Sequence, residues 1–485
     1  MTRRPITRLE LAGYLLSPSL FVMVVLMVVE AMLAAATTWL VINAGRRVAV
    51  GEFLVTDLVW ILTAQSTSYV VGVISWIFAE RAGYRGFGKF MLRFARENRD
   101  KVTLLSEKPA REQVEPFLTG ETFQCFFNVM YELEFALKLF LGLVFNALVL
   151  GAEIDPSLPF AYVGAFGTLL LMQWGLQKPI ASAYLENQRM NNRITAQGYT
   201  AWDNVFAGNS YNLRLWLFGF KTKLREGLMA QIRAIVAREG MSAMSGIVSL
   251  AIVFATITMV ALRHVGDTVL LVGLATTLPR QIEMTYELHL LASGWNDFIA
   301  IWTRFGGVAA NMSPQPDADF DKRIKYDRLV LREGDHANVV SSLGDAWRVA
   351  LAQPTGRVNV RGGNGTGKSS LLASLKTELK KRAYYWPTTD RLAFHFAGGV
   401  VPVDVEEDEE GEPIVVAETM DKKLGFSSGE RQLKSLEEIV NATDAQVYLL
   451  DEWDANLDAA NKAKADALVD KLAARARVVE ISHRD

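Results

Sequence analysis

Six long apolar segments constrain the fold of this chain more than any other feature of its sequence. They lie near residues 17–42, 54–79, 123–150, 160–184, 243–262 and 268–293. A helix needs about 20 apolar residues to cross the roughly 30 Å of hydrocarbon in a bilayer, and there each segment must satisfy its own backbone polar groups. We therefore expect an α-helical membrane domain with six transmembrane helices. Three charged residues interrupt the third segment: Glu132, Glu134 and Lys138.

The charges of the connecting loops predict the orientation of this domain. Two long loops, 81–122 and 185–242, are rich in Lys and Arg, whereas the other connections are short and 151–158 is acidic. Because basic loops stay in the cytosol, we expect both long loops and both termini there. Helices that continue out of the bilayer would explain loops of this size, with a short helix near 202–216. The basic start of the chain precedes an apolar stretch too long for a cleaved signal peptide, so we expect a multi-pass protein of the bacterial inner membrane, in contact with lipid.

The composition changes after Phe305. Residues 306–319 are rich in Pro, Gly and Asp, which is typical of a linker, and the chain from 320 to 485 has a soluble character. We expect a membrane domain at 1–305, a linker at 306–319 and a soluble domain at 320–485, with a charged strand at 324–331. The net charge of −2 gives no general attraction to nucleic acid. The single cysteine, Cys125, excludes an intrachain disulfide and an all-cysteine metal site.

The soluble part contains the pattern G-x-x-x-x-G-K-[ST], with Gly362, Gly367, Lys368 and Ser369 at its fixed positions. A short apolar run precedes it and a helical pattern follows, as a phosphate-binding loop requires. In such a loop the backbone N–H groups and the helix N-terminus point at the phosphates. Lys368 would reach the β- and γ-phosphates, and the Ser369 hydroxyl would bind Mg²⁺. The other residues assigned to the nucleotide here are Asn364, Gly365 and Ser370.

Two further elements suit nucleotide hydrolysis. The apolar stretch 447–451 ends in Asp451, which is predicted to orient Mg²⁺, and the next residue, Glu452, is placed to polarise the attacking water. Near the end of the chain a second apolar stretch, 478–481, leads to His483. This histidine could sense the γ-phosphate or have a structural role.

A third element opens a helix at residues 426–432. A serine and a glycine at a helix start, Ser427 and Gly429, make a second site that could cap a phosphate. In a single chain this second capping site would have no nucleotide to bind. We therefore expect it to meet the nucleotide of a partner subunit.

Together these elements resemble those of the ABC transporters. The phosphate loop, a signature-like stretch at 426–430, Asp451-Glu452, a D-loop-like stretch at 455–458 and His483 follow one another in the order of that family. With six predicted spans ahead of them, the chain resembles an exporter-type half-transporter, in which a membrane domain and an α/β P-loop ATPase domain are fused and two chains pair. The resemblance implies that ATP lies between Lys368 of one subunit and Ser427, Gly429 and Glu430 of the other.

The chain also departs from that family. Phe426, Ser428 and Glu430 stand where the signature usually has Leu, Gly and Gln. The usual glutamine that links the ATP site to the membrane domain is not evident, and Thr388 stands at the best-matching place. The soluble domain is short, so its helical subdomain must be reduced in size.

Two aromatic residues bear on the nucleotide and the substrate. Tyr326 is a candidate to stack on adenine, with a role in the core or on the surface equally open. The sequence Asp-Glu-Trp ending at Trp453 is similar to that of the cyclic-peptide and siderophore exporters. This similarity favours a peptide-like substrate.

Ionisable residues inside the predicted spans are costly in lipid and usually face the interior of the helix bundle. Glu283 and Glu287 lie on one face of the sixth span because they are four residues apart. A cavity lined by these residues would suit a cationic or amphipathic peptide; alternatively, the sixth helix has already reached the cytosol, or Glu134 and Lys138 only pair with each other. The full set is Glu30, Glu132, Glu134, Lys138, Glu283, Glu287 and His289.

These features predict an ATP hydrolase that drives export of a small or peptide-like substrate as a homodimer. An ATP-driven importer of a peptide or cofactor on a similar scaffold has the same topology, so the sequence does not decide the direction. A regulatory membrane ATPase is a third interpretation. Glu452 argues against it, because a switch that does not hydrolyse nucleotide needs no such carboxylate.

Overall fold

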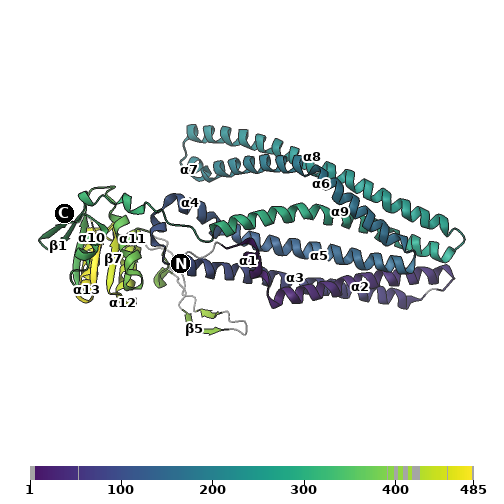
Figure 1. Cartoon of the computed structure of the whole chain (residues 1–485), viewed down its shortest axis with the longest axis horizontal. Coiled ribbons are helices and arrows are strands. Elements are labelled where there is room, and N and C mark those ends of the chain that lie inside the picture. Colours follow the sequence, from purple (N-terminus) through teal and green to yellow (C-terminus); the bar gives the residue numbers. More distant parts are fainter. Residues whose placement is uncertain are drawn as a thin grey trace. The chain divides into compact units, whose positions relative to one another are not determined.

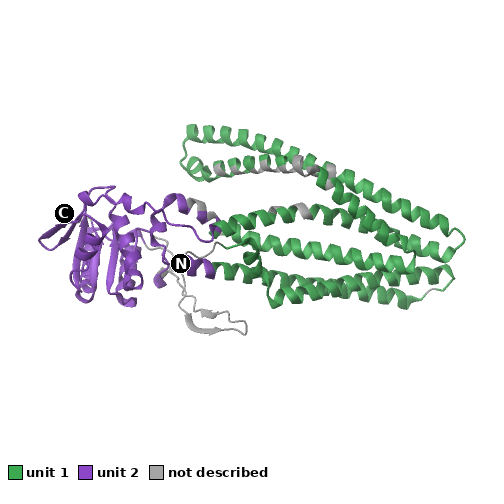
Figure 2. Cartoon of the chain, viewed as in Figure 1, with its two compact units in different colours: residues 1–91, 118–310 green, residues 92–117, 311–485 purple. Residues whose placement is uncertain are grey.

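The structure is a computed structural model that describes residues 6–52, 54–389, 392–397, 402–407, 413–417, 427–455 and 457–482. The chain forms two compact units (Figure 2), of which the first comprises residues 1–91 and 118–310 and the second residues 92–117 and 311–485. The stretch 92–117 comes from the first long basic loop. This part of the loop therefore belongs to the same unit as the C-terminal part of the chain.

The first unit is helical, and most of its helices are much longer than a membrane requires. Ser17 begins the first long helix, because its hydroxyl accepts a hydrogen bond from Leu20 N–H and Pro18 occupies the first turn. The helices of this unit are α1 (Arg8–Ala12), α2 (Pro18–Ala49), α3 (Val55–Asn98), α5 (Thr122–Glu153), α6 (Ser157–Tyr199), α7 (Ala201–Phe206), α8 (Ser210–Arg263) and α9 (Thr268–Asn311). The end of α3, from residue 92, and the last residue of α9 belong to the second unit. The prediction of long helices is confirmed by these lengths, while their continuation beyond a bilayer remains a prediction.

Four helical segments among the described residues are long and apolar enough to cross a membrane. They are Pro18–Ala49, Val55–Asn98, Thr122–Glu153 and Ala243–Arg263. In the fourth predicted span only a shorter apolar stretch, Ser157–Met172, is found. The chain thus has the helices of a membrane protein, and a total of six spans remains a prediction.

In the first unit, α2 packs along α5, and α6 runs beside α8 with the short helix α7 at their tip (Figure 1). The short helix predicted near 202–216 is present only at Ala201–Phe206, and the residues from Ser210 onward already belong to α8. A core of buried apolar side chains, among them Ile42, Leu143, Val253 and Met284, joins α2, α5, α8 and α9. The long helices α2, α5, α6, α8 and α9 each contribute buried apolar side chains to this core.

The second unit contains the strands and the shorter helices. Its strands are β1 (Val330–Glu333), β2 (His336–Val339), β3 (Gly356–Arg361), β4 (Ala383–Trp386), β5 (Pro402–Glu407), β6 (Pro413–Ala417), β7 (Val447–Asp451) and β8 (Arg477–Ile481). Its α-helices are α4 (Lys108–Pro116), α10 (Leu343–Ala350), α11 (Lys368–Leu379), α12 (Ser428–Ala442) and α13 (Ala459–Arg475). Its 3-10 helices are η2 (Val102–Ser106), η4 (Phe320–Arg323), η5 (Tyr326–Arg328), η6 (Lys380–Arg382) and η7 (His395–Ala397). The strand predicted at 324–331 begins only at Val330, because the 3-10 turn η5 occupies residues 326–328 of the expected range.

A six-stranded mixed sheet with the strand order β2-β1-β3-β8-β7-β4 organises this unit. The strands β3, β8, β7 and β4 are parallel, whereas β1 pairs antiparallel with β2 and β3. Every residue of β7 and β8 is buried, as expected for central parallel strands covered on both faces. The carboxyl ends of these strands meet at one edge of the sheet, where Asp451 pairs in register with Ile481.

The stretch 92–117 is attached to the rest of the second unit through several specific contacts. The 3-10 helix η2 packs against α11. Asn98 donates a 2.8 Å hydrogen bond to the carbonyl of Met312, and the Lys101 amine donates to Ser313 Oγ and to the carbonyl of Pro314, both at 2.7 Å. The predicted linker at 306–319 is thus helical as far as Asn311, and the chain that follows is held by residues of the first basic loop.

Candidate functional site

The glycine loop, residues 362–367, connects β3 to α11, so the predicted order of strand, loop and helix is present. Thr366 anchors the loop: its hydroxyl donates 2.8 Å to the carbonyl of Gly363, and its own carbonyl accepts from Lys325 N–H at 3.0 Å. Gly363, Asn364 and Gly365 are exposed. The loop therefore has a fixed base and an open rim, in front of the N-terminus of α11.

Two glycines of this loop have no room for a side chain. A Cβ on Gly362 would lie 2.8 Å from Thr366 Oγ1 and 2.9 Å from the carbonyl oxygen of Arg328. Gly367 has a φ of +89°, and a Cβ there would lie 2.6 Å from the carbonyl oxygen of Arg323. A positive φ and backbone atoms this close both favour glycine, so the conformation of the loop explains the two fixed glycines of the pattern.

Lys368 and Ser369 occupy the first turn of α11. The Lys368 amine donates to the loop carbonyls of Gly362, at 2.8 Å, and Gly363, at 3.4 Å. The Ser369 hydroxyl donates 3.0 Å to Oδ1 of Asp451 at the end of β7. The structure thus brings together the loop lysine, the serine and the aspartate that the sequence predicted for one site, and Ser370 follows in the same turn of the helix.

Asp451 is buried, with 5% of its surface exposed. Burial raises the pKa of its carboxyl to about 6, while the Ser369 hydroxyl and the charge of Lys368 act in the opposite direction. A carboxylate beside a hydroxyl provides oxygen donors of the kind that Mg²⁺ takes together with the phosphates of a substrate. Ser369 and Asp451 could therefore hold a magnesium ion, whose positive charge would stabilise the carboxylate form of Asp451.

Thr388 lies near this aspartate, at the place where the sequence suggested a substitute for a glutamine. Its hydroxyl donates 3.3 Å to the backbone carbonyl of Asp451. The contact supports the position of the strand end. Like Ser369, the Thr388 side chain also lowers the pKa of the Asp451 carboxyl, against the larger effect of burial.

Glu452 begins a turn, residues 452–455, that we call the Glu452 turn. Its φ is +50°, one of two positive values among the described non-glycine residues, and its carbonyl accepts from Ala455 N–H at 3.1 Å. Positive φ is uncommon for a residue with a side chain and often marks functional turns. Glu452 directly follows Asp451, and its side chain is partly exposed.

Ser427 and Glu430 form a capping box at the start of α12. Ser427 Oγ accepts from Glu430 N–H at 3.3 Å, and a Glu430 carboxylate oxygen accepts from Ser427 N–H at 2.9 Å. These bonds lower the pKa of Glu430, so its carboxylate is charged at neutral pH. Both side chains are exposed, while Gly429 is buried. The side chains of Ser427 and Glu430 bond to each other, and the Ser427 carbonyl accepts from Arg431 N–H at 2.9 Å within the helix.

Several predicted residues lie outside or beside this geometry. Phe426, Asn456 of the D-loop-like stretch and His483 fall outside the described residues. Tyr326 packs against the core around β1 and β3, and burial raises its pKa. The packing of Tyr326 agrees with the alternative of a core role that the sequence left open.

The sequence did not single out one buried charged cluster behind the site. Glu480 on β8 is 2% exposed, and both of its oxygens accept from the guanidinium of Arg357 on β3, at 3.0 and 2.9 Å. The indole N–H of Trp453 donates 2.7 Å to the same carboxylate. The sequence contains a signal for this cluster: Glu480 interrupts the apolar stretch 478–481, and a buried charge requires partners.

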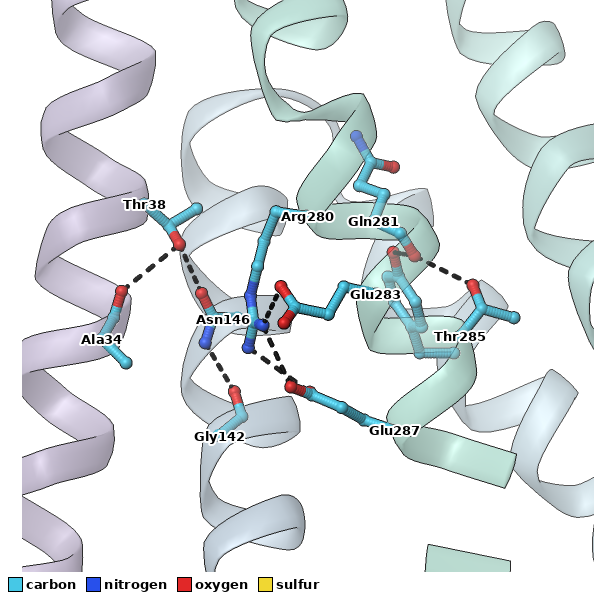
Figure 3. A network of polar contacts seen from close by, with 10 residues as sticks. Ala34, Thr38, Gly142, Asn146, Arg280, Gln281, Glu283, Thr285 and Glu287 are labelled. Carbon is cyan, nitrogen blue, oxygen red and sulfur yellow. Dashed lines mark hydrogen bonds and ion pairs between the residues drawn. The ribbon is translucent and has the colours of Figure 1, made fainter. Parts of the chain in front are cut away.

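Charged residues also meet in the first unit. Arg280 on α9 donates to Glu283 at 2.7 Å and to Glu287 at 3.0 Å, and Thr38 on α2 donates to Asn146 on α5 at 2.5 Å (Figure 3). A separate ion pair joins the Lys138 amine to Glu30 at 2.6 Å. This ion pair links α5 to α2, and Glu134 also interacts electrostatically with Lys138, so the alternative of a pair between Glu134 and Lys138 stays open.

In comparisons with known proteins, no family model and no curated protein matches this chain. Among the residues that the structure describes, no group of three or more His, Cys, Asp or Glu side chains is arranged to hold a metal ion.

Proposed function

We propose that this chain is an ATP-driven exporter of a small or peptide-like substrate, acting as a homodimer in the bacterial inner membrane. The observation that carries the proposal is the hydrogen bond between Ser369 and Asp451. It joins the first turn after a glycine loop to a buried carboxylate at a strand end. Lys368 directly precedes Ser369 in the sequence, and Glu452 directly follows Asp451. Such a set suits the phosphates and the metal ion of a nucleoside triphosphate.

In the proposed mechanism each residue has a separate task. The N–H groups of the glycine loop and of the α11 N-terminus hold the phosphates. Lys368 would leave the loop carbonyls and bind the β- and γ-phosphates. Ser369 and Asp451 would hold Mg²⁺, which would supply positive charge against the phosphates. Glu452 accepts a hydrogen bond from the attacking water and draws its proton away.

The proposal of a second copy is supported by the start of α12. Ser427 and Ser428 are exposed, and a helix N-terminus attracts phosphate. The tip of the α6–α8 pair also carries exposed aromatic side chains, with Trp202 72% and Phe206 69% exposed. Large apolar groups gathered on a surface mark an interaction site, and a second subunit would cover them.

Coupling between the nucleotide site and the membrane helices is supported by η2. This 3-10 helix packs against α11, whose first residues are Lys368 and Ser369, and it follows directly on the long helix α3. A movement of α11 on nucleotide binding would therefore be passed to α3. The charged residues Glu30, Lys138, Arg280 and Glu287 in the membrane unit favour a substrate with charged groups.

Transport into inverted membrane vesicles tests the proposal. Vesicles containing the protein are given external ATP with a mixture of host extract and cationic or cyclic peptides, and the accumulated species are identified by mass spectrometry. We expect a species that accumulates with wild type and with the control Glu437→Gln, which changes an exposed residue of α12, but not with Glu452→Gln. ATP hydrolysis without accumulation would instead favour import, to be checked in right-side-out vesicles, or regulation. Absence of ATP hydrolysis would overturn the proposal.

A further inference from the structure

The Glu452 turn has two supports that the proposed mechanism does not use. The first is Trp453, which is 1% exposed and donates its indole N–H to Glu480 at 2.7 Å. Arg357 holds that carboxylate through two hydrogen bonds, and its Cζ lies 5.9 Å from the centre of the indole ring. The residue after Glu452 is therefore fixed to β3 and β8 in the centre of the sheet.

Arg357 is itself fixed by further contacts. Its guanidinium also bonds Asp466 at 2.8 Å and Asp470 at 2.7 Å, both on α13. The side chain of Arg357 is 16% exposed. A planar guanidinium with several carboxylate partners has little freedom to rotate, so Trp453 rests on a rigid base.

The second support is Gln432 on α12. Its amide nitrogen donates 2.8 Å to the carbonyl of Trp453 and 3.3 Å to the carbonyl of Glu452. The two N–H groups of one amide thus hold two successive carbonyls of the turn. Because Glu452 has a positive φ, which a residue with a side chain keeps only where its surroundings impose it, these bonds bear directly on the direction of its carboxylate.

We propose that Gln432 is a positioning residue that sets the orientation of Glu452 from α12. The indole of Trp453 fixes the residue that follows Glu452 in the same turn. This inference rests on the proposed role of Glu452 in hydrolysis. It has a consequence for the dimer, since α12 begins with Ser427, the proposed contact to the partner's nucleotide. Nucleotide bound at the start of α12 would then act through Gln432 on the hydrolytic carboxylate of the other site.

The test is a double-mutant cycle in the purified full-length protein in nanodiscs. Gln432→Met keeps the length of the side chain but loses both donors, and we expect kcat for ATP to fall about 10- to 100-fold, because small misplacements of a reacting group have effects of this size. The KM for ATP should stay within about threefold. In the Glu452→Gln background, the same substitution should have no further effect on single-turnover hydrolysis, because residues that act through one another are not additive.

Other variants separate positioning from general stability. Lys434→Met, an exposed position on the same helix, should leave kcat unchanged. Gln432→Glu has the same shape as the wild type but offers a carboxylate to two carbonyls, so it should lose at least as much activity as Gln432→Met. The Hill coefficient for ATP should fall in both Gln432 variants. Should the Met variant not fold, Trp453→Phe, which keeps an aromatic ring but loses the donor to Glu480, is taken through the same cycle with the same expectation.

The outcomes that would overturn the inference are distinct from failure of the proposed function. Equal losses in the wild-type and Glu452→Gln backgrounds, or a kcat within twofold of wild type, would show that the Gln432 bonds do not act on Glu452. If wild type hydrolyses no ATP, or if Glu452→Gln is as active as wild type, the proposed function fails and takes the inference with it.

Discussion

The hydroxyl of Ser369 donates a 3.0 Å hydrogen bond to the carboxylate of Asp451. The two residues come from different elements, the first turn of α11 and the end of β7, and the helix packs against that strand. Asp451 is nearly completely buried, so a partner for its oxygen contributes strongly to the arrangement. In the proposed function, a metal ion and a phosphate would bind beside this contact.

Replacing Ser369 should separate metal-dependent from metal-independent binding. In Ser369→Ala we expect kcat/KM for Mg²⁺-ATP to fall at least about 10-fold, because a metal ligand is lost, while binding of ATP in EDTA stays within about twofold. Thr377→Ala is the control, since its hydroxyl bonds only to the carbonyl of Ala373 in its own helix. A variant that retains full Mg²⁺-dependent activity would argue against a metal ion at Ser369.

The two glycines at positions 363 and 367 should respond differently to substitution. Gly367→Ala places a side chain at a φ of +89° and within 2.6 Å of a backbone oxygen, and the left-handed conformation alone costs about 1–2 kcal/mol. We expect ATP affinity, measured with a fluorescent analogue, to fall by at least 10-fold. Gly363→Ala is the matched control, because its Cβ would meet only Thr366 Cγ2, at 3.9 Å. Similar affinities for the two variants would contradict this account of the loop.

The local structure of the second unit followed from its sequence where short-range patterns decide it. The strand, glycine loop and helix around Lys368 are present, and the strand 447–451 ends at Asp451 as predicted. These elements depend on apolar runs and on glycine geometry, which neighbouring residues determine. By contrast, the expected strand at 324–331 is shortened by η5, because turn formation at Tyr326 depends on its packing against the core.

Contacts between distant residues were not predictable in the same way. Lys138 has Glu134 four residues away, yet it pairs with Glu30, which lies on another helix. Trp453 was identified only by its neighbours in the sequence, and its bond to Glu480 depends on the parallel arrangement of β3, β8 and β7. The attachment of 92–117 to the second unit likewise rests on bonds to residues more than 200 positions away, such as that from Asn98 to Met312.

Glu430 stands where the similar family has glutamine, and its charge should oppose phosphate binding at the start of α12. Glu430→Gln removes this charge but keeps the capping box, since glutamine can replace glutamate there. We therefore expect a lower KM for ATP, by about two- to fivefold, as one unfavourable charge is removed from a helix N-terminus. The check is ATP hydrolysis as a function of ATP concentration at low and high salt. An unchanged or higher KM would indicate that no phosphate approaches this helix.

The ion pair between Glu333 and Arg477 should make the stability of the second unit depend on pH. Arg477 is 1% exposed and its guanidinium lies 2.6 Å from the Glu333 carboxylate, which holds the pKa of Glu333 below its ordinary value. The pair stabilises the fold above the unfolded pKa of about 4.3, and this stabilisation is lost as the pH falls through the lower folded pKa. At neutral pH, Glu333→Gln should lower stability by about 1–2 kcal/mol, a value reduced by solvent at the partly exposed Glu333.

Thermal unfolding of the full-length protein in detergent tests this dependence. The difference in apparent Tm between wild type and Glu333→Gln should be constant between pH 5.5 and pH 8, with both values chosen well above about 4.3. It should shrink below about pH 4, where the carboxylate of the folded protein takes up a proton. A difference that stays the same at low pH would show that the carboxylate charge makes no contribution.

The pair of Glu30 and Lys138 should behave as a coupled unit within the membrane helices. Glu30 has 10% of its side chain exposed and Lys138 has 52%, so removing the lysine leaves a buried carboxylate without its cation. We expect Lys138→Met to lower the apparent Tm more than Glu30→Gln does, because an unpaired buried charge is more costly than an unpaired exposed one. The double variant Glu30→Gln/Lys138→Met should recover most of the loss, with a coupling energy of about 1–3 kcal/mol. Fluorescence-detected gel filtration after heating gives the apparent Tm of wild type and of the three variants. The control is the same cycle on the exposed pair of Arg111 and Glu115, for which we expect a coupling energy below about 1 kcal/mol. Additive losses at Glu30 and Lys138 would mean that the two charges are solvated independently and do not hold α2 to α5.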